Sequence, residues 1–225
     1  MEMRLLILCV VVAAWLALPG TVGCGQSASG GGPEVSLPPP TTTGGMGVAE
    51  AIAKRRSVRQ FTAEALTMEE VSQLAWAAQG ITEPERGLRA APSAGALYPL
   101  ELYLFTKDGV FHYLPKGHKL AQLSEKDSRT ELSAAALGQS SVREAALAFV
   151  LTGVFARTEA KYGKRSGQYV YMEAGHAAQN IHLQAVALGL GSVPVGALQE
   201  KAVADVLGLS SEETPLYIVP VGHPR

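Results

Sequence analysis

A change in composition near residue 47 constrains most strongly what this chain can fold into. An apolar run over residues 5–18 follows Arg4 and has the length of a signal-peptide core, which is short for a membrane span. Residues 24–46 are rich in Gly, Ser, Pro and Thr and carry too little apolar surface to offset the entropy of ordering. We therefore expect an export signal over residues 1–23, a flexible linker over residues 24–46 and one folded domain over residues 47–225.

The end of the leader resembles a bacterial lipoprotein cleavage site. Small residues precede Cys24, although Thr21 stands where the pattern usually has Leu. Lipidation of Cys24 would tether the protein to the membrane, so we expect an exported protein of the bacterial cell envelope, either anchored or periplasmic. Two alternatives remain open, namely a plain signal-peptidase cut and an uncleaved anchor that leaves the domain facing the cytoplasm.

Charge and cysteine usage exclude several classes of function. The formal net charge is -1, so the chain lacks the basic surface by which proteins bind nucleic acid. Both cysteines, Cys9 and Cys24, precede the domain, which therefore has no internal disulfide, thiolate metal cluster or catalytic cysteine. The histidines have no metal-ligand spacing, and His176 and His182 fall on different faces of a helix, so we expect no metal site.

The pattern of elements predicts an α+β fold, with helices packed on a mostly antiparallel or mixed sheet. Thr67 and Glu70 form a capping box at the start of a helix. Asp108-Gly109 marks the turn of a hairpin. The expected helices cover residues 48–56, 67–78, 168–190 and 199–207, with short helical pieces over 119–145. The expected strands cover residues 100–106, 110–114, 146–153 and 216–221, and residues 80–95 are expected to form a loop.

Three segments carry candidate chemistry. Residues 55–59 place Arg55, Ser57 and Arg59 in one short turn, which suits a phosphate but equally suits a solvated helix end. Residues 91–99 form a proline-flanked loop of small residues, which lets backbone approach a flat ring or serves as a rigid connector. Residues 189–196 are a second small-residue loop, which a helix C-cap also explains.

Taken in this order, these segments resemble the nitroreductase superfamily, and within it the branch of SagB-type and thiazoline-oxidase-type FMN dehydrogenases. The order of the motifs is the specific part of the resemblance. It covers nearly the whole domain and is carried by residues 55–61, 74–80, 92–103, 172–180 and 219–223.

The resemblance implies a nitroreductase-like fold and a homodimer with two FMN sites at the subunit interface, each lined by both chains. Arg55, Ser57 and Arg59 would hold the FMN phosphate and ribityl chain, and Arg225 would add a basic group from the C-terminal segment. The expected ring contacts are Gln79 at the ring edge, Pro92, Ser93, Ala94 and Gly95 from the partner subunit, and Val195 with Gly196 near the reactive nitrogen.

The implied activity is ping-pong hydride transfer from NAD(P)H, or an organic donor, to an electron-poor small-molecule acceptor. The cofactor carries such chemistry, so no catalytic side chain is expected. Azole-forming dehydrogenases of the same branch carry a Lys-Tyr pair before the long helix, and residues 166–171 lack one, which argues against peptide azoline oxidation. Two alternatives stay open: an envelope-tethered flavin- or ligand-binding module without turnover, and a flavin oxidase using oxygen or a quinone.

Overall fold

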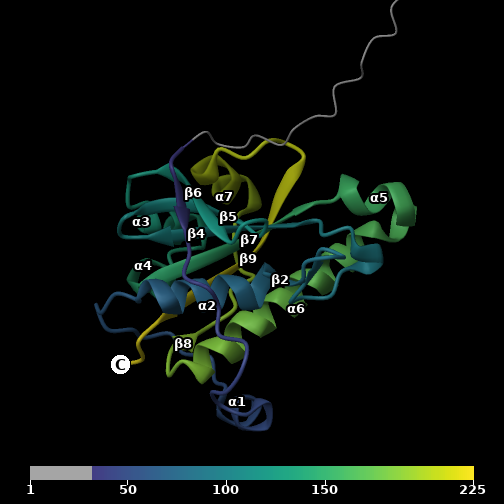
Figure 1. The fold of residues 1–225 in the computed structure, drawn as a ribbon. Helices are drawn as coiled ribbons and strands as arrows, with labels where there is room; N and C mark the ends of the chain where they lie inside the picture. Colours follow the sequence, from purple (N-terminus) through teal and green to yellow (C-terminus); the bar gives the residue numbers. More distant parts are fainter. Residues whose placement is uncertain (1–31) are drawn as a thin grey trace, which may run out of the picture.

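The computed structural model describes residues 32–225, so the expected export signal and Cys24 lie outside the described residues. The described part is an α+β fold built on a seven-stranded sheet of order β1-β6-β5-β4-β7-β9-β8, in which every neighbouring pair is antiparallel (Figure 1). The strands of this sheet are β1 (Glu34–Ser36), β4 (Leu100–Thr106), β5 (Gly109–Leu114), β6 (Lys119–Ser124), β7 (Leu147–Val154), β8 (Gly191–Ser192) and β9 (Glu213–Gly222).

Helices cover both faces of the sheet. They are α1 (Val48–Lys54), α2 (Met68–Gln79), α3 (Arg129–Ala135), α4 (Ser140–Glu144), α5 (Ala156–Tyr162), α6 (Ser166–Ala187) and α7 (Glu200–Leu207). The helices α2 and α6 pack on one face, and α3, α4 and α7 pack on the other. Among residues 32–225, no helix is long and apolar enough to cross a bilayer.

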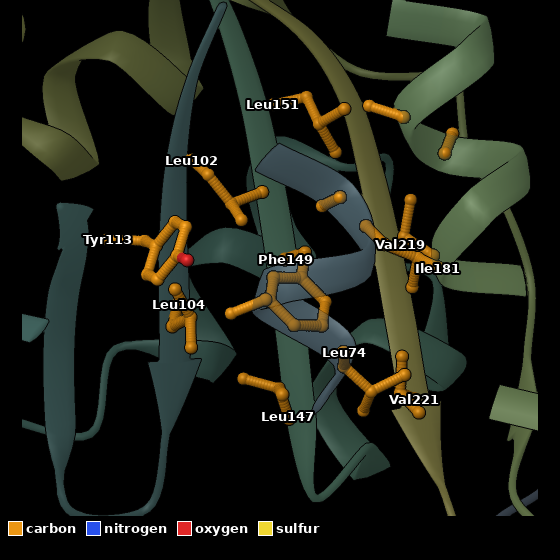
Figure 2. Close-up of a cluster of buried hydrophobic side chains, with 14 of the residues drawn as sticks. Leu74, Leu102, Leu104, Tyr113, Leu147, Phe149, Leu151, Ile181, Val219 and Val221 are labelled. Carbon is orange, nitrogen blue, oxygen red and sulfur yellow. The ribbon is translucent and has the colours of Figure 1, made fainter. Parts of the chain in front are cut away.

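Strand alternation explains why the sheet is buried on both sides. In β4, Leu102 and Leu104 point toward α2 and α6, whereas Tyr103 and Phe105 point to the opposite core. Successive side chains of a strand leave opposite faces, so one strand supplies both cores. Figure 2 shows the first core, where Phe149 of β7 lies among leucines and valines from neighbouring strands and helices.

Local signals fix several element ends as expected. The capping box of α2 is present, because Thr67 accepts from the N–H of Glu70 while the Glu70 carboxylate accepts from the N–H of Thr67. At the other end of the chain, α7 stops at Gly208, whose φ of 65° is left-handed and favours glycine. The predicted hairpin is formed by β4 and β5.

The predicted flexible linker is wrong for residues 33–41. Residues 33–41, here called the N-terminal strap, lie on the domain and begin with β1, which pairs with β6. Leu37 is buried, and the N–H and C=O of Thr41 both bond to the side-chain amide of Gln73, at 2.8 and 3.1 Å. The composition of the strap is typical of a linker, but an unpaired edge of β6 and a buried glutamine supply partners that composition does not reveal.

Three other expectations need correction. Residues 119–124 were expected to be helical but form β6, because they complete a meander with β5. Residues 80–95 contain a small two-stranded sheet, β2 (Ile81–Glu83) with β3 (Leu88–Arg89), and a 3₁₀ turn at Ala94–Ala96. Within the loop of residues 189–196, Gly191 and Ser192 pair with β9 as β8.

Candidate flavin site

The first predicted segment converges on a buried histidine of α6. Arg55 caps the C-terminus of α1, and its Nη1 lies 2.8 Å from Nε2 of His182. On the other side of the ring, His182 Nδ1 lies 2.5 Å from Oγ of Ser192. Burial, together with the positive charge of Arg55, lowers the pKa of His182 to about 4. Arg55 is thus held beside a neutral imidazole.

The chain after Arg55 runs along β8 and then along the C-terminal residues. Ser57 forms a parallel bridge with Ser192, and the N–H of Val58 donates to the carbonyl of Ser192 at 3.0 Å. The N–H of Arg225 donates to the carbonyl of Gln60 at 3.2 Å. The structure therefore brings the Arg55–Arg59 turn and the C-terminal residue into one neighbourhood, with Ser57 and Arg59 exposed to solvent.

The second predicted segment, residues 92–98, is fixed to the opposite end of α6. The N–H of Ala94 donates to Oε1 of Glu173 at 2.9 Å, and the N–H of Tyr98 donates to Oγ of Ser93 at 2.9 Å. Glu173 is buried, and burial raises the pKa of its carboxyl group. These bonds leave Pro92 and Gly95 on the surface as a rigid, small-residue loop.

A Lys-Tyr pair lies directly against this loop. A Cβ atom added at Gly95 would lie 2.8 Å from Nζ of Lys161 and 3.0 Å from Oη of Tyr162. Gly95 has a φ of 64°, so glycine suits both the left-handed backbone and the close approach of these side chains. The two residues end α5, shortly before α6 begins.

Gln79, expected at the edge of the flavin ring, lies at the end of α2 and is buried. Its Oε1 accepts a hydrogen bond of 3.0 Å from Nη1 of Arg89. The guanidinium of Arg89 stacks 4.5 Å from the ring centroid of Tyr98. Gln79 is thereby connected to the 92–98 loop through Arg89 and Tyr98.

An ion pair between Arg157 and Glu101 also contacts the 92–98 loop. Nη1 of Arg157 donates to the carbonyl of Tyr98 at 3.1 Å, and Nη2 lies 2.5 Å from Oε1 of Glu101. The second carboxylate oxygen of Glu101 lies 2.8 Å from Nε2 of His112. The backbone of Tyr98 has a φ of 47°, a left-handed value that these contacts hold in place.

The third predicted segment joins the sheet beside β8. The N–H of Val195 donates to the carbonyl of Ile218 at 2.7 Å, and the reverse bond is 3.0 Å. Val195 is buried while Gly196 is exposed. Only Gly196 of this pair is presented to solvent, next to the ring of Tyr217.

The two halves of the expected site are separated within one chain. Glu173, which holds the 92–98 loop, and His182, which holds Arg55, are nine residues apart on α6. At 3.6 residues per turn this is about two and a half turns, so the residues lie on opposite faces and about 13 Å apart along the axis. Figure 1 shows α5 near one end of α6, and α1 and β8 near the other.

The match to a known family decides the identity. Residues 52–223 match the model of the nitroreductase family. The chain belongs to this family. Membership makes it a flavin oxidoreductase, and the match spans all three segments described above.

Two curated relatives share this family's sequence pattern. A protein of Methanocaldococcus jannaschii named for its likeness to nitroreductases is 40% identical over 180 residues, covering 77% of this chain and 89% of the relative. The trifolitoxin-processing protein TfxB of Rhizobium leguminosarum is 30% identical over 132 residues, covering 54% of this chain. The aligned part is 35% of TfxB, so this chain spans about a third of that relative.

Solved structures share the fold. A nitroreductase-like protein of Ralstonia eutropha superimposes with a TM-score of 0.79 at 28% identity, covering 85% of this chain and 90% of that one. The NADPH:FMN oxidoreductase of Vibrio harveyi, in complex with NAD+, gives 0.60 at 25% identity, covering 79% and 68%. A chain of the Escherichia coli microcin synthetase complex gives 0.67 at 23% identity, covering 85% and 78%, which shows a shared fold alone.

The sequence analysis missed three elements of this nitroreductase-family site. It treated His182 as a structural or surface histidine, whereas His182 is buried on α6 and contacts both Arg55 and Ser192. It did not single out Glu173. It also searched for a Lys-Tyr pair only in residues 166–171, whereas Lys161 and Tyr162 stand just upstream. A search extended by one helical turn would have found the pair.

Proposed function

We propose that this chain is an FMN-dependent oxidoreductase that acts as a homodimer. The observation that carries the proposal is the separation of the Arg55 cluster from the 92–98 loop on opposite faces of α6. A second copy would supply the missing half of each site. Exposed apolar side chains on α1 and α6, Val48, Ile52, Tyr171 and Met172, offer surface for that contact.

The residues present fit FMN. Arg55 lies beside a neutral histidine, Ser57 and Arg59 follow it in the same exposed turn, and the N–H of Arg225 bonds to the adjoining Gln60, which suits a phosphate dianion. The 92–98 loop offers exposed backbone and small side chains, which suit close approach to a flat ring.

Bound FMN would supply two-electron hydride chemistry, taken from NAD(P)H or an organic donor and passed to an electron-poor small-molecule acceptor in a ping-pong sequence. The chain's own part is to bind and orient. Arg55 and Ser57 would hold the phosphate end, and Gln79, Gly95 and Gly196 would contact the ring. The V. harveyi enzyme, named for NADPH and FMN, supports this pairing of donor and cofactor.

We place the protein in the SagB-type branch. Its Lys161-Tyr162 pair also removes the argument against peptide azoline oxidation, which rested on the lack of such a pair in residues 166–171. Lys161 and Tyr162 stand before the long helix and meet Gly95 of the ring-facing loop. TfxB, a relative named for trifolitoxin processing, supports an organic donor as an alternative to a nicotinamide. An organic donor also suits the export that we propose from the leader, with Cys24 as the membrane tether, because free NAD(P)H is scarce outside the cytoplasm.

The visible spectrum of the full chain tests this function. Protein purified without added flavin should show oxidised-flavin bands that bleach anaerobically with NADH or NADPH, and it should migrate as a dimer. Bands that resist both nicotinamides but bleach with an organic donor would favour the second route. A colourless monomer that refuses added FMN would overturn the proposal.

A pair of variants makes the test specific. Arg55→Ala should weaken FMN binding by roughly tenfold or more, because it removes a charge-assisted contact to phosphate. The neighbouring Arg56 is the matched control, since within residues 32–225 its Nη1 donates only to the carbonyls of Ala53 and Arg55. Arg56→Ala should bind FMN as the unchanged chain does.

A further inference from the structure

The tautomer of His182 follows from its two partners. A guanidinium has donors only, so Nε2 of His182 must accept the 2.8 Å hydrogen bond from Nη1 of Arg55. The ring proton then sits on Nδ1 and is donated to Oγ of Ser192 at 2.5 Å. The three side chains form a directed series, here called the Arg55–His182–Ser192 relay.

The relay is anchored in the sheet. Ser192 is buried in β8 and pairs with Val221 of β9. Its carbonyl accepts from the N–H of Val58, and its backbone bridges Ser57. Ser192 therefore holds the 55–59 turn at two points, once through His182 and Arg55 and once through the backbone after Ser57.

A histidine at this position differs in effect from a carboxylate. Glutamate or aspartate beside Arg55 would hold the guanidinium equally well but would cancel its charge. His182 is buried with its pKa lowered, so at neutral pH it accepts a hydrogen bond without carrying charge. The remaining donors of Arg55 and its whole positive charge stay available to an anion.

We propose that His182 and Ser192 are positioning residues that aim the Arg55 guanidinium at the flavin phosphate, so that the site selects FMN over unphosphorylated riboflavin. This inference rests on the proposed function. It assigns the selectivity to two residues of the relay, His182 and Ser192, that do not themselves touch the cofactor, and it makes that selectivity depend on one acceptor atom, Nε2 of His182.

Two substitutions test the roles of Nδ1 and Nε2 of His182 separately. Asparagine is short and places its amide near Nδ1, so His182→Asn keeps a partner for Ser192 and loses the acceptor for Arg55. Glutamine reaches the place of Nε2, so His182→Gln keeps an acceptor for Arg55. Dissociation constants for FMN and for riboflavin, measured by flavin-fluorescence quenching on the full chain, give the ratio that reports phosphate recognition.

The expected result is a loss of FMN preference, by roughly tenfold, in His182→Asn and its retention in His182→Gln. In an Arg55→Ala background, His182→Asn should have no further effect on the ratio. Should His182→Asn fail to fold, Ser192→Ala tests the same relay, and we expect a smaller loss of preference because Nδ1 alone loses its partner.

The outcomes distinguish the two proposals. If the unchanged chain binds neither flavin, or binds both equally, the proposed FMN function is overturned. If the unchanged chain prefers FMN and His182→Asn keeps that preference, only the relay is overturned. A loss of affinity that is equal for FMN and riboflavin would also overturn the relay, because it would show a structural effect on the whole pocket.

Discussion

The carboxylate of Glu173 on α6 accepts a hydrogen bond of 2.9 Å from the backbone N–H of Ala94, and this bond fixes the 92–98 loop to the longest helix among the described residues. Glu173 is buried, and burial raises the pKa of its carboxyl group. A buried carboxylate is retained here although it is costly to desolvate. Its geometry indicates that holding the 92–98 loop is its structural role.

We predict that Glu173→Leu destabilises the fold, by about 1–3 kcal/mol, because the N–H of Ala94 loses its acceptor in a water-poor place. Glu173→Gln should change the free energy of unfolding by less than about 1 kcal/mol, since its amide oxygen can accept the same bond. Urea unfolding of both variants measures the difference. Equal losses in the two variants would contradict a role for this bond.

We predict that Gly95→Ala impairs flavin binding beyond its backbone strain. Its φ of 64° makes alanine unfavourable by roughly 1 kcal/mol, and the new methyl would displace Lys161 and Tyr162. Gly87→Ala is the matched control, because Gly87 has a φ of 65° with nothing within 4 Å. Both variants should lose similar stability, while only Gly95→Ala should shift the flavin absorption bands. Identical flavin spectra for the two variants would show that Gly95 does not lie near the flavin ring.

We predict that the free energy of unfolding decreases as the pH is lowered, because His182 becomes protonated. Its folded pKa of about 4 lies below the ordinary value of 6.5, so the unfolded chain takes up a proton first as the pH falls. The contribution is complete above the unfolded pKa and is lost between 6.5 and about 4. The free energy of unfolding should fall by about 3 kcal/mol over this range.

Urea midpoints at about pH 7 and about pH 4.5 test this sign. His182→Gln removes the titrating group and should show a smaller drop between the two pH values. A drop of the same size in the variant would assign the acid sensitivity to other groups.

We predict that the N-terminal strap is part of the folded domain. A chain that begins at Gly47 should be less stable than one that begins at Gly32 by about 3 kcal/mol, because it exposes the site of Leu37 and leaves the buried Gln73 amide without Thr41. Leu37→Ala in the longer chain should account for about 2 kcal/mol of this loss. Thermal unfolding of the three chains gives the comparison. Equal midpoints would contradict the prediction and would show that the strap is a linker that does not stabilise the domain.

The sequence analysis found most elements whose signals are local. The capping box of α2, the turn between β4 and β5 and the glycine that ends α7 each depend on a few neighbouring residues. It failed where partners are distant. Residues 119–124 have no strong preference of their own, and they form a strand because β5 and β1 pair with them.

The candidate site divides in the same way. Arg55, Ser57 and the 92–98 loop were recognisable from residue type and order, because anion binding and close backbone approach require particular side chains. The residues that hold these segments in place were not recognisable from the sequence. Glu173 and His182 acquire their roles from the face of α6 on which each lies and from the loop that packs there.

By itself, the sequence determined the family, the α+β class and the residues suited to a phosphate and a flat ring, since these depend on side-chain chemistry and on motif order. Only the tertiary structure decided that the strap belongs to the domain, that a neutral histidine holds Arg55, and that the two halves of the site lie on opposite faces of one helix. The physical reason is that burial and long-range hydrogen bonds set these features, and both depend on residues far apart in the chain.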